Sequence, residues 1–275
     1  MALAFDPPLL PSEVSAALGG DIQVIRALQP GGQGAVFVVR HGTATEVLKI
    51  YAIAQRTRAE RECSALARLD CDAVVQLVSW GEVTIRGEDA VYTLTEFVDG
   101  ETLRERLKRQ VLTEDEARTL GVCVARAIRA LWESGRIVHR DIKPDNIMIT
   151  MTGAAVLLDL GIARHQDLTT LTAQGWTLGT AGYMSPEQAR GRKSLTYRSD
   201  FFVLGIVLYE AVSGRHPFLF TQDLIGRRNP ERLETIAGVS SEFADVVHSL
   251  MALNPMDRPH DCVRVVELLT RKERY

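Results

Sequence analysis

The sequence predicts an α+β protein of two lobes, in which a small β-rich lobe precedes a larger, mainly helical lobe. Two observations support this fold class. The first third of the chain carries short runs of β-branched and aromatic residues around glycine-rich turns, with one helical pattern among them. From residue 112 onwards, amphipathic helical patterns dominate. We place an N-terminal extension at 1–20, the first lobe at 21–97 and the second at 98–275, with a single domain over 21–270.

The strand patterns of the first lobe read IQVIRAL, AVFVVR, EVLKIY, VVQLVSWGEV and AVYTLTEFV. Between the third and the fourth, residues 55–69 have a helical period. Ahead of the first strand, SEVSAALGG predicts a short helix that begins after the N-cap Ser12 and ends at Gly19. We interpret this short helix as a terminal appendage.

The second lobe opens with the long amphipathic segment LTEDEARTLGVCVARAIRALWESG. Thr113 and Glu116 have the spacing of a capping box, and Gly135 is expected to end the helix. Short strands and loops follow in IVHRDIKPDNIMI and AAVLLDLGIAR. The later helices are predicted in SDFFVLGIVLYEAVSG, SEFADVVHSLMAL and DCVRVVELLTRK.

The composition excludes several classes of protein. A net charge of −3 gives no general attraction to nucleic acid or to acidic membranes. The four cysteines are scattered, which argues against a metal cluster or a disulfide framework and for a reducing compartment. No apolar run approaches the about 20 residues that a spanning helix needs. We therefore predict a cytoplasmic protein without nucleic acid partners or a membrane segment; a fragment of a membrane-anchored parent stays an open alternative.

The stretch IVHRDIKPDNIMI places dense charge between apolar residues, which would be a poor way to build a core. In such a loop the carboxylate of Asp141 can accept a proton from an attacking hydroxyl. The ammonium of Lys143 can neutralise a phosphoryl oxygen, and the amide oxygen of Asn146 is a hard ligand suited to Mg²⁺. Asp159, at the end of the apolar strand in LLDLG, suits a second metal ligand. The structural alternative is a salt-bridged loop.

Two weaker signals lie in the first lobe. The glycines of LQPGGQG allow backbone N–H groups to approach phosphate oxygens, but they fit a simple hairpin turn equally well. Lys49 lies in the apolar strand EVLKIY, where it could be a catalytic cation or an exposed residue of an edge strand. A partner carboxylate would favour the first interpretation, and the following helix offers Glu60 and Glu62.

The order of glycine-rich loop, strand lysine, helix glutamate, HRDIKPDN, DLG and SPE resembles the eukaryotic-type (Hanks-type) Ser/Thr protein kinases. The segment SDFFVLGIVLYEAVSGRHPF adds to this resemblance, which covers about 21–269. SPEQ and the compact length are more similar to bacterial members. The resemblance implies the bilobal protein-kinase fold, ATP with Mg²⁺ or Mn²⁺ as cofactors, and a protein substrate that offers Ser or Thr.

The resemblance also implies roles for single residues. Asp141 would be the catalytic base and Lys143 the contact to the transferred phosphoryl group. Lys49 would hold the α- and β-phosphates and pair with Glu62, which fits the family's register better than Glu60. Asn146 and Asp159 would be the metal ligands. The implied cofactor-binding set is Gly31, Gly32, Gly34, Val36, Val47, Lys49, Thr95, Glu96, Val98, Met148 and Asp159.

Further implied contacts are structural. Glu187 would form a buried ion pair with Arg258, and Asp200 would anchor the backbone of the catalytic loop. Thr180 in GTAGYMSPE, together with Lys143, matches the serine/threonine branch of the family.

The resemblance suggests control by phosphorylation. Arg140, which directly precedes the catalytic aspartate, would be a cation that awaits an activation-loop phosphate. The loop is rich in threonine, and the alternative interpretation is a polar loop without this role. We expect autophosphorylation there, which a transient homodimer would allow in trans. The candidates, with Thr172 first and Thr177 second, are Thr169, Thr170, Thr172 and Thr177.

Departures from the family pattern leave alternatives open. Gln29 stands in place of the first loop glycine, and Leu160 in place of the phenylalanine of D-F-G. Val47 stands where alanine is usual. None removes a group that does chemistry, so a pseudokinase scaffold is the secondary interpretation. A kinase for small molecules is disfavoured by GTAGYMSPEQ, which resembles a peptide-docking loop.

Overall fold

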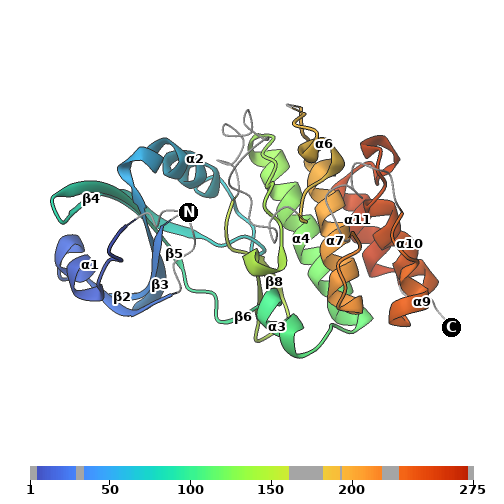
Figure 1. The fold of residues 1–275 in the computed structure, drawn as a ribbon, viewed down its shortest axis with the longest axis horizontal. Coiled ribbons are helices and arrows are strands. Elements are labelled where there is room, and N and C mark those ends of the chain that lie inside the picture. The colour runs from blue at the N-terminus through green and yellow to red at the C-terminus, as the bar shows by residue number, and fades with distance from the viewer. Residues whose placement is uncertain (1–4, 29–33, 161–181, 193, 219–228, 272–275) are drawn as a thin grey trace. The chain divides into compact units, whose positions relative to one another are not determined.

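The structure is a computed structural model that describes residues 5–28, 34–160, 182–192, 194–218 and 229–271 (Figure 1). The chain divides into two compact units. Unit 1 consists of Met1–Leu69 and Val75–Val98, and unit 2 consists of Asp70–Val74 and Asp99–Tyr275. Unit 1 is β-rich and unit 2 is mainly helical, which confirms the predicted α+β class.

Unit 1 is built on one antiparallel five-stranded sheet with the strand order β1-β2-β3-β5-β4. Strands β2 and β3 and strands β4 and β5 pair as neighbours in the chain, whereas β3 pairs with β5. The strands are β1 (Ile22–Ala27), β2 (Ala35–His41), β3 (Ala44–Ala52), β4 (Leu77–Ile85) and β5 (Glu88–Glu96), and the helices are α1 (Pro11–Leu18), η1 (Ile53–Gln55) and α2 (Arg56–Leu66).

Each face of this sheet is covered by a different helix (Figure 1). Side chains alternate along a strand, so Leu48 and Ile50 of β3 point to one face, where they pack in a core with Val14 of α1. On the opposite face, Tyr51 packs with Ala59 of α2.

The prediction that the N-terminal helix is only an appendage was therefore wrong. Val14 is fully buried, because α1 covers an apolar sheet face that would otherwise meet water. The predicted N-cap Ser12 was also wrong. The helix begins at Pro11 after the N-cap Leu10, whose N–H donates to Glu13 Oε2 at 2.8 Å. The C-cap is Gly19, as predicted.

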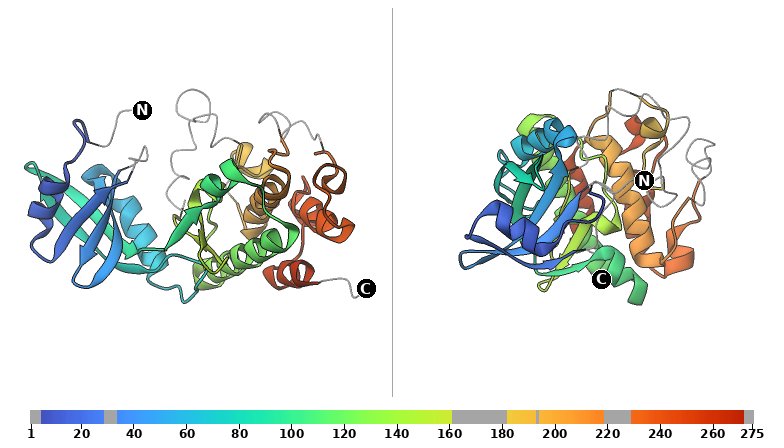
Figure 2. Two further views of the ribbon diagram at one scale, coloured as in Figure 1. Left: turned by 90° about the horizontal axis from the view of Figure 1, so that it is seen from below. Right: turned by 60° about the vertical axis from the view of Figure 1, so that its left-hand side comes forward.

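Unit 2 combines a small antiparallel sheet with helices that pack around α7 (Figure 2). The sheet contains β6 (Gly100–Thr102), β7 (Ile147–Thr150) and β8 (Ala155–Leu157). The helices are α3 (Leu103–Arg109), α4 (Glu114–Gly135), η2 (Pro144–Asn146), α6 (Pro186–Ala189), α7 (Tyr197–Ser213), α9 (Leu233–Ala237), α10 (Ser241–Leu250), η5 (Pro255–Asp257) and α11 (Cys262–Thr270).

Helix α4 has the predicted start and ends at the predicted Gly135. Thr113 N–H donates to Glu116 Oε2 at 2.7 Å, and Glu116 N–H donates to Thr113 Oγ1 at 3.3 Å, which completes the capping box. Gly135 is the last helical residue, and the left-handed C-cap is Arg136 with φ 56°. The Arg136 guanidinium lies 4.9 Å from the centroid of the Trp132 ring, a contact that helps to offset the cost of this backbone conformation.

Helix α7 forms the centre of unit 2, between α4 and α10, and is buried along almost its whole length. Gly205 permits a close approach here, since a Cβ at this position would lie 2.6 Å from Met251 Cγ. Because α7 is held from several sides, its N-terminal turn is a rigid base for the loop that precedes β7. In the described part of the chain, no helix is both long and apolar enough to cross a membrane.

Candidate active site

The charged loop between α4 and β7 is held by Asp200 in the first turn of α7. Asp200 is 1% exposed, and its carboxylate accepts the backbone N–H of His139 at 2.8 Å and that of Arg140 at 3.0 Å. Burial raises the pKa of Asp200 to about 7, although the two N–H donors oppose this shift. The predicted anchoring role of Asp200 is confirmed. Arg140 has a left-handed backbone with φ 68°, which this pair of bonds stabilises.

The side chains of Lys143 and Asn146 both contact the same carboxylate oxygen of Asp141. Lys143 Nζ lies 3.2 Å from Asp141 Oδ2, and Asn146 Nδ2 donates to the same oxygen at 2.9 Å. Asn146 Nδ2 also donates to the backbone oxygen of Asp141 at 2.9 Å. The short 3-10 turn η2 brings Asn146 back towards Asp141, so the grouping predicted from the sequence occurs in the fold. The side chain of Asp141 is buried but for 8% of its surface.

The two predicted metal ligands lie at the same end of the β7–β8 pair. Ile147 is opposite Leu157 in the antiparallel register, and Leu158 N–H donates to the Asn146 backbone oxygen at 3.0 Å. Asp159 is the next residue. Asn146 Nδ2 donates its hydrogen bonds to Asp141, so the amide oxygen Oδ1 is the atom of Asn146 that would bind a metal.

One amide oxygen and one carboxylate are suitable ligands for Mg²⁺. No cluster of three or more His, Cys, Asp or Glu suited to a metal occurs among the residues the structure describes. Mg²⁺ usually keeps several waters and binds phosphate oxygens, so a metal held by Asn146 and Asp159 would complete its coordination in that way.

In unit 1, the sheet register places four residues of the predicted nucleotide set on one face. Val36 lies opposite Lys49, and Val47 lies opposite Thr95. Directly opposed residues of an antiparallel pair point to the same face, and positions 47 and 49 of one strand share a face as well. This is the face that α2 covers, opposite the face covered by α1.

The two candidate partners of Lys49 differ in environment. Glu60 has a 37% exposed side chain and pairs with Arg56, four residues earlier, at 2.8 Å. Glu62 is only 7% exposed, so it lies on the inward side of α2. This difference favours Glu62, the choice made from the sequence.

Other members of the predicted set have separate structural contacts. Glu96 ends β5, and its Oε1 accepts the N–H of Gln76 at 3.1 Å. A Cβ at Gly34 would lie 2.5 Å from the backbone oxygen of Ile50, so this glycine lets β2 approach β3 closely. Val98 is the last residue of unit 1, and Met148 lies in β7 opposite Val156.

Several predicted positions lie outside the described residues. They are Gly31 and Gly32 of the glycine-rich loop, Gln29, the phosphorylation candidates Thr169, Thr170, Thr172 and Thr177, and Thr180, which the resemblance also places in the regulatory segment.

Arg140 has an unusual environment for a cation. Its Nε is buried and has no hydrogen-bond partner within the ranges the structure describes. Burial lowers the pKa of Arg140, and the nearby charge of Asp200 opposes this effect. An anion that reached the guanidinium would therefore gain a charge-assisted bond with a partly desolvated donor.

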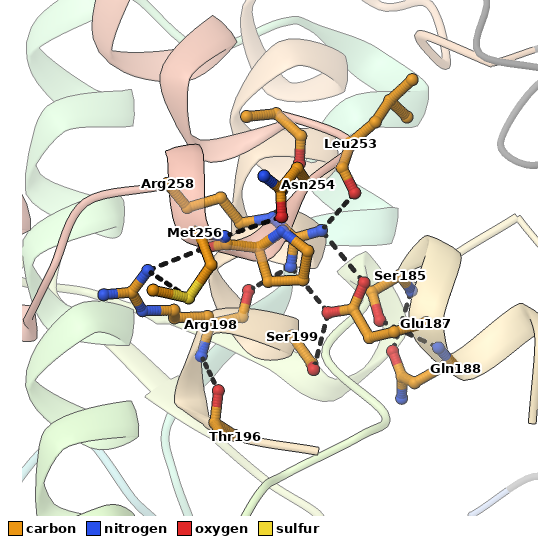
Figure 3. A network of polar contacts seen from close by, with 12 residues as sticks. Ser185, Glu187, Gln188, Thr196, Arg198, Ser199, Leu253, Asn254, Met256 and Arg258 are labelled. Carbon is orange, nitrogen blue, oxygen red and sulfur yellow. Dashed lines mark hydrogen bonds and ion pairs between the residues drawn. The ribbon is translucent and has the colours of Figure 1, made fainter. Parts of the chain in front are cut away.

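Glu187 and Arg258 form the predicted buried ion pair of unit 2 (Figure 3). Arg258 donates from Nη1 to Glu187 Oε1 at 2.7 Å and from Nη2 to Oε2 at 3.0 Å. Ser199 Oγ donates to Glu187 Oε1 at 2.7 Å. Burial opposes ionisation of Glu187, but the bonds from Arg258 and Ser199 outweigh it and lower the pKa of Glu187. The prediction is confirmed, and Ser199 is a third member that the sequence did not indicate.

Sequence reasoning missed a second polar network, centred on Arg104 of α3. Its guanidinium lies 3.3 Å from Asp145, 2.8 Å from Glu210 and 2.8 Å from the Tyr183 hydroxyl. Tyr183 also donates to Glu210. The network connects η2, the segment before α6 and the helix α7. Its members are far apart in the chain, and no local pattern marks them.

These two units contain a lysine-bearing strand in a five-stranded sheet and an Asp-Lys-Asn loop on a helical base, the parts of a phosphoryl-transfer domain. The family model for the protein kinase domain matches residues 22–269, and the chain therefore belongs to the protein kinase family.

Curated relatives are bacterial Ser/Thr kinases by name, which confirms the expected resemblance to bacterial members. The chain is 32% identical over 214 residues to the probable serine/threonine-protein kinase CPE1738 of Clostridium perfringens, covering 74% of this chain and 30% of that protein. It is 41% identical over 166 residues to the probable kinase PknB of Corynebacterium glutamicum, covering 59% and 25%. It is 36% identical over 217 residues to PknA of Mycobacterium tuberculosis, covering 74% and 49%. The matches thus span half or less of these relatives.

Proposed function

We propose that the protein is an ATP- and Mg²⁺-dependent Ser/Thr protein kinase. The observation that carries this proposal is the convergence of Lys143 and Asn146 on Asp141, in a loop anchored by Asp200. The family membership and the names of the relatives support it.

The proposed reaction is transfer of the γ-phosphoryl group of ATP to a Ser or Thr hydroxyl of a protein. The hydroxyl oxygen forms a bond to the γ-phosphorus while the bond to the β–γ bridging oxygen breaks, and ADP leaves. Asp141 orients the hydroxyl and accepts its proton. Lys143 offsets negative charge on the transferred group, and its bond to Asp141 holds both side chains in position.

The nucleotide would be bound by residues of the sheet face that α2 covers. Val36 and Val47 would provide apolar contact to the adenine, and the other members of the proposed set near the ring are Thr95, Glu96, Val98 and Met148. Lys49, supported by Glu62, would hold the α- and β-phosphates. Asn146 and Asp159 would hold Mg²⁺ or Mn²⁺, which supplies positive charge to the phosphate oxygens.

We also propose control by phosphorylation of the loop that contains Thr169, Thr170, Thr172 and Thr177. The buried Arg140 Nε supports this idea, since a phosphate would provide an anionic acceptor for it. A transient homodimer would let one copy phosphorylate another. The scattered cysteines of the sequence favour a reducing, cytoplasmic compartment.

The test is incubation of the purified protein with Mg-ATP and a generic protein substrate, followed by phosphosite mass spectrometry. Asp141→Asn and Lys49→Met are matched variants, whose folding is checked by thermal denaturation. We expect the wild type to transfer phosphate and both variants to lose this activity. The rate of transfer should fall by about 10²-fold or more in Asp141→Asn, which removes the proposed base. Nucleotide binding without any transfer by the wild type would instead support the scaffold alternative.

A further inference from the structure

The residues ahead of β1 contribute side chains to the core of unit 1, although the kinase-family match begins only at residue 22. Val14 is fully buried and Leu9 is 6% exposed. Both belong to the core that contains Leu48 and Ile50 of β3. Residues 5–18, which we term the strap, are thus an added layer on the sheet of unit 1.

The strap is attached near both edges of this sheet. β1 and β4 are the outermost strands, on opposite sides. At the β1 edge, Val24 N–H donates to Ser15 Oγ at 3.1 Å, next to a bulge in the β1–β2 register. At the other edge, the strap is attached to the β4–β5 turn by Arg86.

Arg86 makes four hydrogen bonds to the strap. Its Nε lies 2.9 Å from Glu13 Oε1, and its Nη2 lies 2.7 Å from Glu13 Oε2. Its Nη1 donates to the Pro7 carbonyl at 2.7 Å, and its Nη2 donates to the Pro8 carbonyl at 3.0 Å. The hydrogen bonds from Arg86, together with that from the Leu10 N–H, lower the pKa of Glu13 to about 2.

Arg86 lies in a turn whose backbone conformation does not favour arginine. Arg86 has φ 58° and Gly87 has φ 81°, which are the positive values that a two-residue type I′ hairpin turn requires. Asn-Gly is the preferred pair in such a turn, and arginine is not. The strap contacts therefore compensate for an unfavourable backbone choice.

We propose that the strap positions the nucleotide-binding face of the sheet, and that Arg86 and Glu13 hold it in place. This inference rests on the function proposed above. Leu48 and Ile50 face the strap, while Lys49, which lies between them in β3, faces the nucleotide side. Any shift of the strap that moves Leu48 and Ile50 also moves Lys49. The strap likewise supports β1, which leads into the glycine-rich loop.

The proposal has a thermodynamic consequence that does not depend on catalysis. If attachment of the strap favours nucleotide binding, nucleotide binding must favour attachment of the strap by the same factor. Amide hydrogen exchange in residues 10–18 should therefore slow when Mg-ADP is bound, although no nucleotide contact with these residues is proposed.

The experiment compares the wild type with Arg86→Asn and with the control Glu88→Gln, an exposed residue of the same hairpin. Asparagine suits the turn better than arginine, so a defect of this variant cannot come from the turn itself. Titration with Mg-ADP should show that Arg86→Asn binds the nucleotide about 5-fold or more weakly than the wild type. A factor of about 5 is the lower end of the usual range of coupling between two sites. Glu88→Gln should bind as the wild type does.

Equal affinities of Arg86→Asn and the wild type, or an exchange rate in the strap that Mg-ADP leaves unchanged, would overturn the proposal. Glu13→Gln provides the same test if Arg86→Asn does not fold. Failure of the wild type to bind Mg-ADP would refute the proposed function, and the wild-type titration alone shows this. A wild type that binds, with a variant that binds equally well, refutes only the strap.

Discussion

Replacement of Arg258 by methionine removes the cation that neutralises Glu187 while keeping a long apolar stem in the same space. Arg258 is 2% exposed and also donates to the carbonyls of Ala252 at 2.8 Å, Arg198 at 2.7 Å and Leu253 at 3.4 Å. The substitution therefore leaves a buried carboxylate that still accepts a hydrogen bond from Ser199 Oγ but has lost its cation. It also leaves three carbonyls without this donor.

Loss of one partner of a buried ion pair typically costs about 3–5 kcal/mol of unfolding free energy. We expect a value in this range for Arg258→Met, since the bond lost is bidentate and both side chains are buried. Urea denaturation followed by circular dichroism measures the change, with Arg264→Met as a control because Arg264 forms an exposed pair with Glu267. A double variant, Arg258→Met with Glu187→Met, should recover part of the loss. A single variant with a cost below about 1 kcal/mol, the level of a surface pair, would refute the reasoning.

Two further predictions concern Gly34 and the pH dependence of stability. Gly34→Ala should lower the unfolding free energy by about 1–3 kcal/mol, since its Cβ would meet the Ile50 backbone oxygen at 2.5 Å. Gly20→Ala, where a Cβ meets no atom within 4 Å, is its control, and equal melting temperatures would contradict this account. Glu187 has a folded pKa below its ordinary value of 4.5. Its contribution to stability is thus fully present above about pH 4.5 and is lost as the pH falls through the folded pKa. A urea series between pH 7 and pH 3 should show this acid loss, and it should be smaller in Glu187→Gln.

Local spacing determined much of what the sequence predicted correctly. Asp141, Lys143 and Asn146 lie within six residues, so one short loop is enough to bring them together. The capping box of Thr113 and Glu116 depends only on the geometry of one helical turn. Alternation along β3 likewise implies that Lys49 faces away from its apolar neighbours.

Contacts over a long sequence distance could be predicted only where the family resemblance implied them. The pair of Glu187 with Arg258 and the anchoring of the loop by Asp200 are such cases. The bonds of Arg104 to Asp145, Tyr183 and Glu210 had no such guide, because nothing in the neighbourhood of a residue encodes which distant carboxylate will meet it.

The sequence by itself determined the protein kinase motifs and the α+β class, because both depend on residue type, spacing and period. Only the tertiary structure decided that the N-terminal segment belongs to the core. Its apolar residues are few, and their burial depends on the apolar face that β3 and its neighbours present. Only the structure shows that Arg136 is the left-handed cap of α4 and that its guanidinium lies over the Trp132 ring. The residues of a short segment do not show which surface the segment will pack against. The free energy of that packing determines the structure that the segment adopts.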